Sequence, residues 1–116
     1  MKPQTQGIVV FIPSDRVGRG DDELGLNLMM NFIYHLSTSN PVPDMLVLMN
    51  AGVKLAVQGS ELLDELKDLQ GKGTRILACG TCLDFFGIRE KLTVGVVSNM
   101  AEIAKTLLSA GKVITV

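Results

Sequence analysis

Short, continuously apolar runs alternate along this chain with segments long enough to be helices. The runs span residues 7–12, 44–50, 74–79, 93–97 and 112–116. Strands with one solvated face usually alternate apolar and polar residues, whereas strands covered on both faces are apolar throughout. The alternation therefore predicts a parallel sheet of five strands, covered by helices.

Three intervening segments carry helix signals, at residues 21–37, 60–70 and 99–111. Acidic residues open the first segment, and Asn99 with Glu102 forms a capping pair at the start of the third. Gly71 and Gly111 are positioned to end the second and third helices. We predict one domain over residues 1–116, of the α/β class, with a three-layer α/β/α architecture and right-handed crossovers.

The carboxyl ends of parallel strands share one edge of a sheet, and ligands bind beyond that edge. Four predicted loops meet there, at residues 13–23, 50–60, 79–84 and 98–102. The third loop contains both cysteines of the chain, Cys79 and Cys82. The predicted topology therefore places the cysteine pair at the functional edge.

Composition excludes several other classes of protein. The formal net charge is −1 without a basic block, so a nucleic-acid or anionic-membrane partner is not expected. No apolar stretch approaches the roughly 20 residues of a membrane span, and the amino-terminal apolar run is too short for a signal peptide. Two cysteines without a secretory signal favour a reducing compartment, which predicts a cytoplasmic protein.

Cofactor and metal sites are not expected either. Gly18 and Gly20 resemble part of a dinucleotide-binding turn, but Glu23 stands where a third glycine is required, among further acids that would repel a pyrophosphate. Zinc needs about four ligands. The two cysteines and the single histidine, His35, do not supply them.

The cysteine pair itself has several interpretations. Gly80 allows a turn after the strand, and Thr81 with Asp84 fits a capping box that makes Cys82 the first helical residue. A thiol at a helix start has a lowered pKa, although Asp84 opposes this effect. The residues alone leave three interpretations open: a sulfur carrier, a thiol–disulfide redox pair, or two buried apolar side chains.

The stretches "CGTCLDFFGIREKLTVG" and "SNMAEIAKTLLSAGKVITV" resemble the DsrE-like domain of YedF-type selenium-metabolism proteins. The resemblance runs from about residue 8 onward, and "CGTCLD-F-G" is its most specific part. It implies a five-stranded parallel sheet, oligomers, and a cysteine persulfide on a carrier cysteine eight residues before a glycine. Cys79 and Gly87 have that spacing. The resemblance thus implies Cys79 as carrier, with Cys82 as a resolving or tuning thiol.

The leading functional hypothesis is a sulfur- or selenium-relay protein, a persulfide carrier or sulfurtransferase that acts through Cys79. The competing hypotheses are a non-catalytic oligomeric binding module with buried cysteines and a thiol–disulfide redox protein. YedF-type proteins usually have an upstream TusA-like domain, and this chain begins almost at its first strand. Three explanations stay open: the domain is a separate TusA-like sulfur-carrier protein that acts as a partner, this chain is a stand-alone relative, or it is a fragment.

A homo-oligomer is expected from the first predicted helix. Only Asn27, Asn31 and His35 form a polar seam in its middle. A helix that packs on one sheet needs an apolar stripe only a little over 100° wide, and this one is apolar over much more of its surface. The excess apolar surface predicts contacts with other subunits. The apolar residues concerned are Leu24, Leu26, Leu28, Met29, Met30, Phe32, Ile33, Tyr34 and Leu36.

Overall fold

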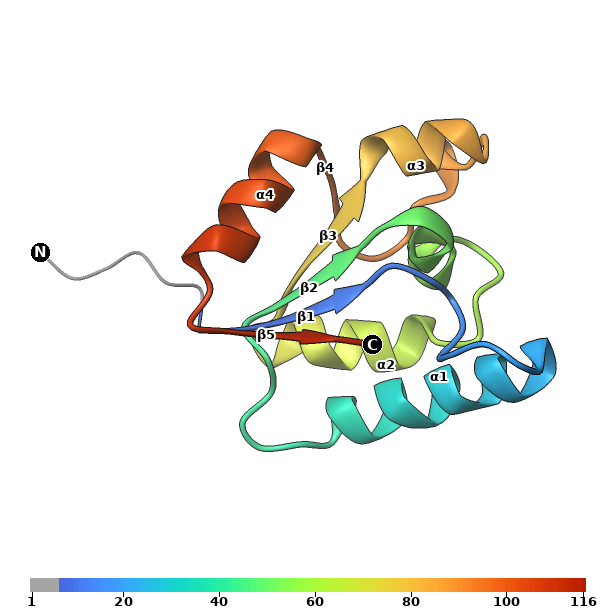
Figure 1. The fold of residues 1–116 in the computed structure, drawn as a ribbon, viewed down its shortest axis with the longest axis horizontal. Helices are drawn as coiled ribbons and strands as arrows, with labels where there is room; N and C mark the ends of the chain where they lie inside the picture. The colour runs from blue at the N-terminus through green and yellow to red at the C-terminus, as the bar shows by residue number, and fades with distance from the viewer. Residues whose placement is uncertain (1–6) are drawn as a thin grey trace, which may run out of the picture.

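The computed structural model describes residues 7–116, which fold around one parallel sheet (Figure 1). The strands lie in the order β4-β3-β2-β1-β5, and every neighbouring pair is parallel. Their bounds are β1 Ile8–Ile12, β2 Met45–Leu48, β3 Arg75–Cys79, β4 Val96–Ser98 and β5 Lys112–Thr115. The predicted α/β class with a five-stranded parallel sheet is confirmed.

Helices lie on both sides of this sheet (Figure 1). Helices α1 and α2 pack together on one face, α4 lies on the other, and α3 continues from the carboxyl end of β3. Two short 3₁₀ helices complete the fold, η1 after β2 and η2 before β4. The helical bounds are α1 Asp22–Ser37, η1 Asn50–Ala56, α2 Leu63–Gly71, α3 Gly80–Phe85, η2 Arg89–Lys91 and α4 Met100–Ser109.

The core lies around the three central strands. All four residues of β2 are buried, as are four of the five in β3. Each fully buried aliphatic side chain contributes roughly 1.5–3 kcal/mol of hydrophobic free energy. The edge strand β5 differs, because all four of its residues are exposed. Within residues 7–116 no helix is both long enough and apolar enough to cross a membrane.

Two predicted helix caps are confirmed. The Asp21 carboxylate accepts a hydrogen bond from the Leu24 N–H at 2.8 Å, at the start of α1. The Asn99 side chain accepts one from the Glu102 N–H at 2.8 Å, at the start of α4. Each cap satisfies an N–H group that has no partner within its helix.

Two segments differ from the prediction. Residues 50–56 were expected to be a loop and instead form η1. Strand β4 begins at Val96, three residues later than the predicted 93–97 run. The reason is that Thr93 and Val94 donate their N–H groups to the carbonyl of Ala56 rather than joining the sheet.

Candidate functional site

Both cysteines lie at the carboxyl edge of the sheet, as the topology predicted. Cys79 is the last residue of β3 and also the N-cap residue of α3. It pairs in register with Ser98, the last residue of β4. Cys82 follows within the first turn of α3. The end of a strand and the start of a helix therefore hold the two thiols within one turn of backbone.

The predicted capping box at this helix start is wrong. Helix α3 begins at Gly80, and no side chain caps it. The Asp84 carboxylate instead accepts two hydrogen bonds from the Arg89 guanidinium, at 2.7 and 2.9 Å. A bidentate guanidinium–carboxylate pair is stronger than a bond to a backbone amide, which explains the change of partner. The same contact holds the pKa of Asp84 below its ordinary value.

The two thiols differ sharply in exposure. Cys79 is only 1% exposed and belongs to the hydrophobic core. Cys82 is partly exposed, and both cysteines are free. A reagent in solution therefore meets Cys82 before Cys79.

A backbone amide points at the accessible thiol. The N–H of Asn50, the first residue of η1, donates to Cys82 Sγ at 3.1 Å. Asn50 has a φ of 52°, in the left-handed region, which asparagine tolerates better than most residues. Nearby Gly52 fixes η1 against the end of β1, because a Cβ at this position would lie 2.2 Å from the carbonyl oxygen of Ile12. The sheet thus holds the Asn50 amide in place.

Burial raises the pKa of Cys82 above its ordinary value. The Asn50 N–H acts in the opposite direction, because it stabilises the thiolate, while the neighbouring Cys79 adds to the increase. The lowered pKa expected for a thiol at a helix start is therefore not found. The resting Cys82 is mostly protonated at neutral pH.

An apolar cavity of about 310 Å³ opens beside Cys82. Asn50, Thr81, Cys82, Phe85 and Phe86 line it. The ammonium group of Lys54 lies 4.3 Å from the centre of the Phe86 ring, a cation–π arrangement. Sequence reasoning missed the two phenylalanines, although an aromatic pair directly after "CGTCLD" was a visible signal.

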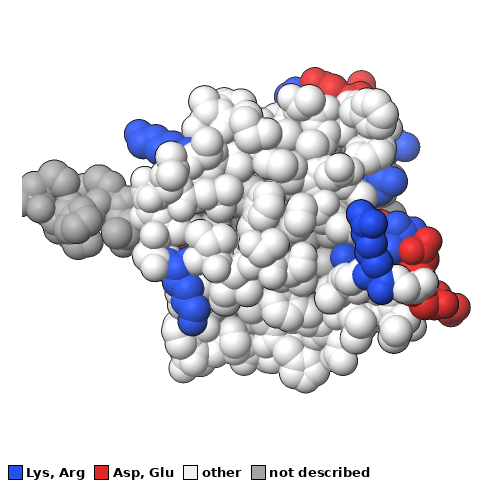
Figure 2. Space-filling view, in the orientation of Figure 1, with Lys and Arg blue, Asp and Glu red and all other residues white. Residues whose placement is uncertain are grey.

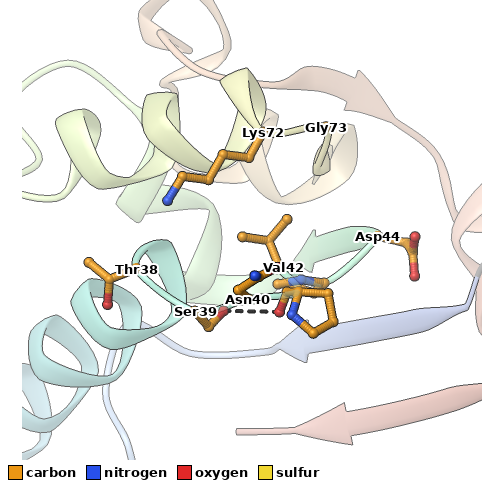
Figure 3. Close-up of a pocket in the computed structure, with 9 residues that line it drawn as sticks. Thr38, Ser39, Asn40, Val42, Asp44, Lys72 and Gly73 are labelled. Carbon is orange, nitrogen blue, oxygen red and sulfur yellow. Dashed lines mark hydrogen bonds between the residues drawn. The ribbon is translucent and has the colours of Figure 1, made fainter.

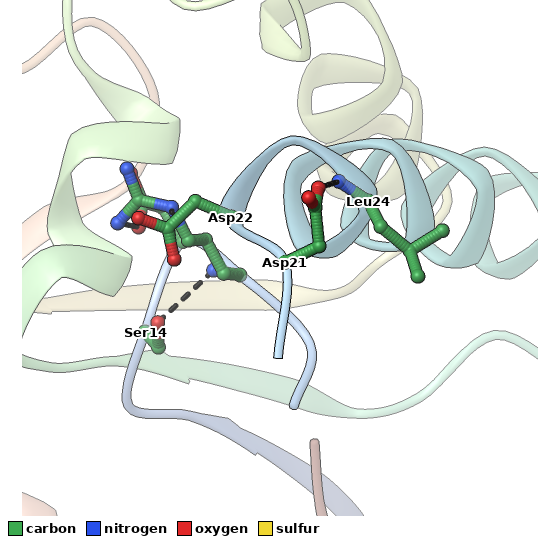
Figure 4. A network of polar contacts seen from close by, with 6 residues as sticks. Ser14, Asp21, Asp22 and Leu24 are labelled. Atoms are coloured by element: carbon green, nitrogen blue, oxygen red, sulfur yellow. Dashed lines mark hydrogen bonds and ion pairs between the residues drawn. The ribbon is translucent and has the colours of Figure 1, made fainter. Parts of the chain in front are cut away.

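The predicted edge loops at residues 13–23 and 50–60 also make contacts away from the cysteines. Asp15 and Lys54 line a second cavity of about 330 Å³, between η1 and α1. Arg16 lies between Asp15 and Asp22, with nitrogen–oxygen distances of 3.4 and 3.9 Å. Its backbone N–H bonds the Ser14 hydroxyl (Figure 4). These residues join the first loop to the start of α1.

His35, the single histidine of the chain, lies in the last turn of α1. Its Nδ1 lies 2.9 Å from the carbonyl oxygen of Asn31, one turn earlier in α1. Across residues 7–116 no three His, Cys, Asp or Glu side chains come together in a group that could hold a metal ion.

A larger cavity, of about 520 Å³, lies at the opposite, amino end of the sheet (Figure 3). Its lining runs from Thr38 to Asp44 and includes Lys72 and Gly73. The Lys72 ammonium group is bonded to the carbonyl of Ser37. This cavity contains no thiol, so it is a weaker candidate than the carboxyl edge.

The fold and the site define an α/β protein with a dithiol at the carboxyl edge of a parallel sheet. A family model described as the DsrE/DsrF-like family matches residues 23–116. The chain belongs to this family, which is associated with sulfur relay.

Solved structures share the fold. The ychN protein from E. coli is 24% identical, with a TM-score of 0.69 over 97% of this chain and 100% of its own. MTH1491 from Methanobacterium thermoautotrophicum, a protein of unknown function, is 23% identical, with a TM-score of 0.68 over 95% of this chain and 98% of its own. BT1422 from Bacteroides thetaiotaomicron, also of unknown function, is 17% identical, with a TM-score of 0.66 over 96% of this chain and 95% of its own. No match is found among curated proteins.

Proposed function

We propose that the protein is a sulfur- or selenium-relay protein of the YedF type that carries a persulfide at the Cys79–Cys82 pair. One observation carries the proposal: the Cys82 thiol lies in an apolar cavity at the carboxyl edge and accepts an N–H hydrogen bond from Asn50. Membership of a family associated with sulfur relay supports the same chemistry.

The site contains the parts that sulfur transfer needs. A thiolate is the nucleophile that takes the outer sulfur from a donor persulfide. The Asn50 N–H faces the atom on which negative charge would appear, and a fixed donor of this kind needs no rearrangement to stabilise it. The cavity beside Cys82 has a mostly apolar lining, which would surround a sulfur atom carried there.

A non-catalytic binding module is the second candidate, and the burial of Cys79 in the core favours it. In that case neither cysteine would take up sulfur. The two functions predict opposite results in the same experiment.

Intact-mass measurement after treatment with a persulfide donor is that experiment. We expect the wild-type protein to take up sulfur, detected as an added mass of about 32 Da when the persulfide persists, since the thiolate is the acceptor. The variant with Cys79→Ala and Cys82→Ser is the matched control and should gain no mass. A wild-type protein that neither gains sulfur nor converts the donor would support the binding module instead.

We further propose that the protein is a homo-oligomer assembled through α1. This helix buries only the single row Gly25, Met29, Ile33 and Ser37. Charged side chains are sparse on the face that α1, β5 and α4 span, and they gather near its rim (Figure 2). Association would remove exposed apolar surface from water at roughly 25 cal/mol per Å². The exposed apolar residues of α1 are Leu24, Leu26, Leu28, Met30 and Tyr34.

Light scattering on dilute protein tests the assembly. We expect a multiple of the chain mass for the wild type and a smaller mass for Met30→Glu, because a buried charge without a partner opposes association. Asn31→Glu is the matched control, since it adds the same charge to an adjacent exposed position. A monomeric wild type at micromolar concentration would contradict the proposal.

The exchange partner we propose is a TusA-like sulfur carrier in the cytoplasm. Phe85 supports a protein partner, because it lines the cavity beside Cys82 and is 83% exposed. An exposed aromatic side chain next to a reactive group is a natural contact for a docking protein. Phe85→Ala should slow sulfur exchange with a protein donor more than exchange with a small persulfide.

A further inference from the structure

The order in which the two cysteines act follows from their burial. Cys79 is 1% exposed, whereas Cys82 is partly exposed and lines the cavity. A donor persulfide approaching from solvent therefore reaches Cys82 first. This order reverses the roles that the family resemblance implied.

The backbone places the second thiol within range of the first. Cys79 is the N-cap residue of α3 and Cys82 is its third helical residue. The side chain of an N-cap residue reaches the backbone of the second or third helical residue, so these two positions lie close together. Disulfides form between residues whose Cα atoms are roughly 4.4–6.8 Å apart, and neighbouring turns meet this requirement with small adjustments.

We propose that Cys82 receives sulfur and that Cys79 resolves the resulting persulfide, so that the pair releases hydrosulfide and closes as a disulfide. This inference rests on the proposed function and specifies its product. The substrate class is a persulfide, carried by a small thiol or by a protein. A selenium-loaded Cys82 would release hydroselenide by the same route.

The proposed reaction has two steps. In the first, Cys82 takes the outer sulfur of a donor persulfide, and the donor leaves as its thiol with the proton that Cys82 gave up. In the second, Cys79 attacks the inner sulfur of the Cys82 persulfide. The new bond joins the two cysteine sulfurs, the outer sulfur leaves as sulfide, and the proton of Cys79 leaves with it. The two cysteines are thereby oxidised, and a dithiol reductant must restore them.

Two features of the site suit this order. The Asn50 N–H faces Cys82 Sγ and is placed to stabilise its thiolate during the first step. The buried Cys79 is shielded from the donor, so it is preserved as a thiol for the second step. The leaving sulfide has an exit through the cavity that Phe85 and Phe86 line.

Single variants separate the two steps. Each protein, fully reduced, is treated with one equivalent of glutathione persulfide without oxygen, and sulfide and intact mass are followed together. The wild type should release about one sulfide per chain and lose about 2 Da, which marks the disulfide. Cys79→Ala should keep an added mass of about 32 Da and release sulfide at least about tenfold more slowly. Cys82→Ser should neither gain this mass nor release sulfide above background.

The double variant with Cys79→Ala and Cys82→Ser gives the background release by the reagent. Melting curves check folding, and Cys79→Ser replaces Cys79→Ala if alanine unfolds the core. Sulfide release by the Cys79 variant at the wild-type rate, or persulfide on Cys79 in Cys82→Ser, would overturn the proposed order. If the wild type behaves like the double variant, the relay function itself fails, which is a different result.

Discussion

The two ends of the parallel sheet use their polar groups differently. At the amino end the larger cavity is bordered by groups engaged in structure, with Lys72 bonded to the carbonyl of Ser37 and Thr74 to that of Pro43. At the carboxyl end the smaller cavity contains a thiol, and its hydrogen-bond donor is a residue in a left-handed conformation. In this molecule chemistry and backbone strain mark the candidate site better than cavity volume does.

The largest expected effect separates the two thiols of the carboxyl end. In the native protein, Cys82→Ser should slow alkylation by iodoacetamide at least about 100-fold, because the buried Cys79 reacts only when the structure opens locally. Cys79→Ala should leave the main reaction nearly unchanged. Rates followed by intact mass give the answer. Equal rates for the two single variants would show that burial does not distinguish the thiols.

The next prediction compares Gly52, at the carboxyl end of the sheet, with Gly71, at the amino end. Gly52→Ala should lower the free energy of unfolding by about 1–3 kcal/mol, since the new methyl group overlaps a backbone carbonyl of β1. Gly71→Ala, at the end of α2, is the matched control. Its Cβ meets nothing within 4 Å, so the change should be neutral or stabilising.

Urea unfolding measures both variants. Gly52→Ala should also weaken the Asn50–Cys82 contact and alter the alkylation rate of Cys82, whereas Gly71→Ala should not. If Gly52→Ala were as stable as the wild type, η1 would not be fixed against β1 as described.

The third prediction concerns the pH dependence of Cys82 alkylation. Burial raises the pKa of Cys82, so its thiolate fraction is small at neutral pH. The alkylation rate should rise about tenfold per pH unit from pH 6 to 8 and keep rising through about pH 8.5, the ordinary thiol value. A plateau near neutral pH would indicate a lowered pKa and would contradict the structure.

The smallest effect lies at the amino end. Thr74 is 2% exposed, and its hydroxyl donates to the carbonyl of Pro43 at 2.7 Å. Thr74→Val should cost about 1 kcal/mol of stability through the lost hydrogen bond. Urea unfolding measures the loss, and sulfur uptake should not change. A loss of uptake in this variant would place the function at both ends of the sheet.

Much of the fold was predictable because it depends on local patterns. Continuous apolar runs indicated all five strands, and the side-chain caps of α1 and α4 follow from Asp21 and Asn99. Helix η1 was missed because a short 3₁₀ segment has no apolar periodicity to reveal it. The delayed start of β4 depends on bonds to Ala56, which is distant in sequence.

The site was predictable in position but not in orientation. Topology placed both cysteines at the carboxyl edge, and the structure agrees. Helix α3 starts two residues earlier than the capping box suggested, so Cys82 is its third residue rather than its first. The Asp84 carboxylate does not cap this helix, because it pairs with Arg89, five residues further along the chain.

The most direct test of a relay at the carboxyl end is a peptide map of the sulfur-loaded wild type. Trypsin cuts after Arg75 and Arg89, so residues 76–89 contain both cysteines in one peptide. After loading with a persulfide donor and rapid alkylation without reductant, we expect this peptide to carry an alkylated persulfide or an internal Cys79–Cys82 disulfide. Two ordinary alkylated thiols in every copy of the peptide would contradict a sulfur-relay function.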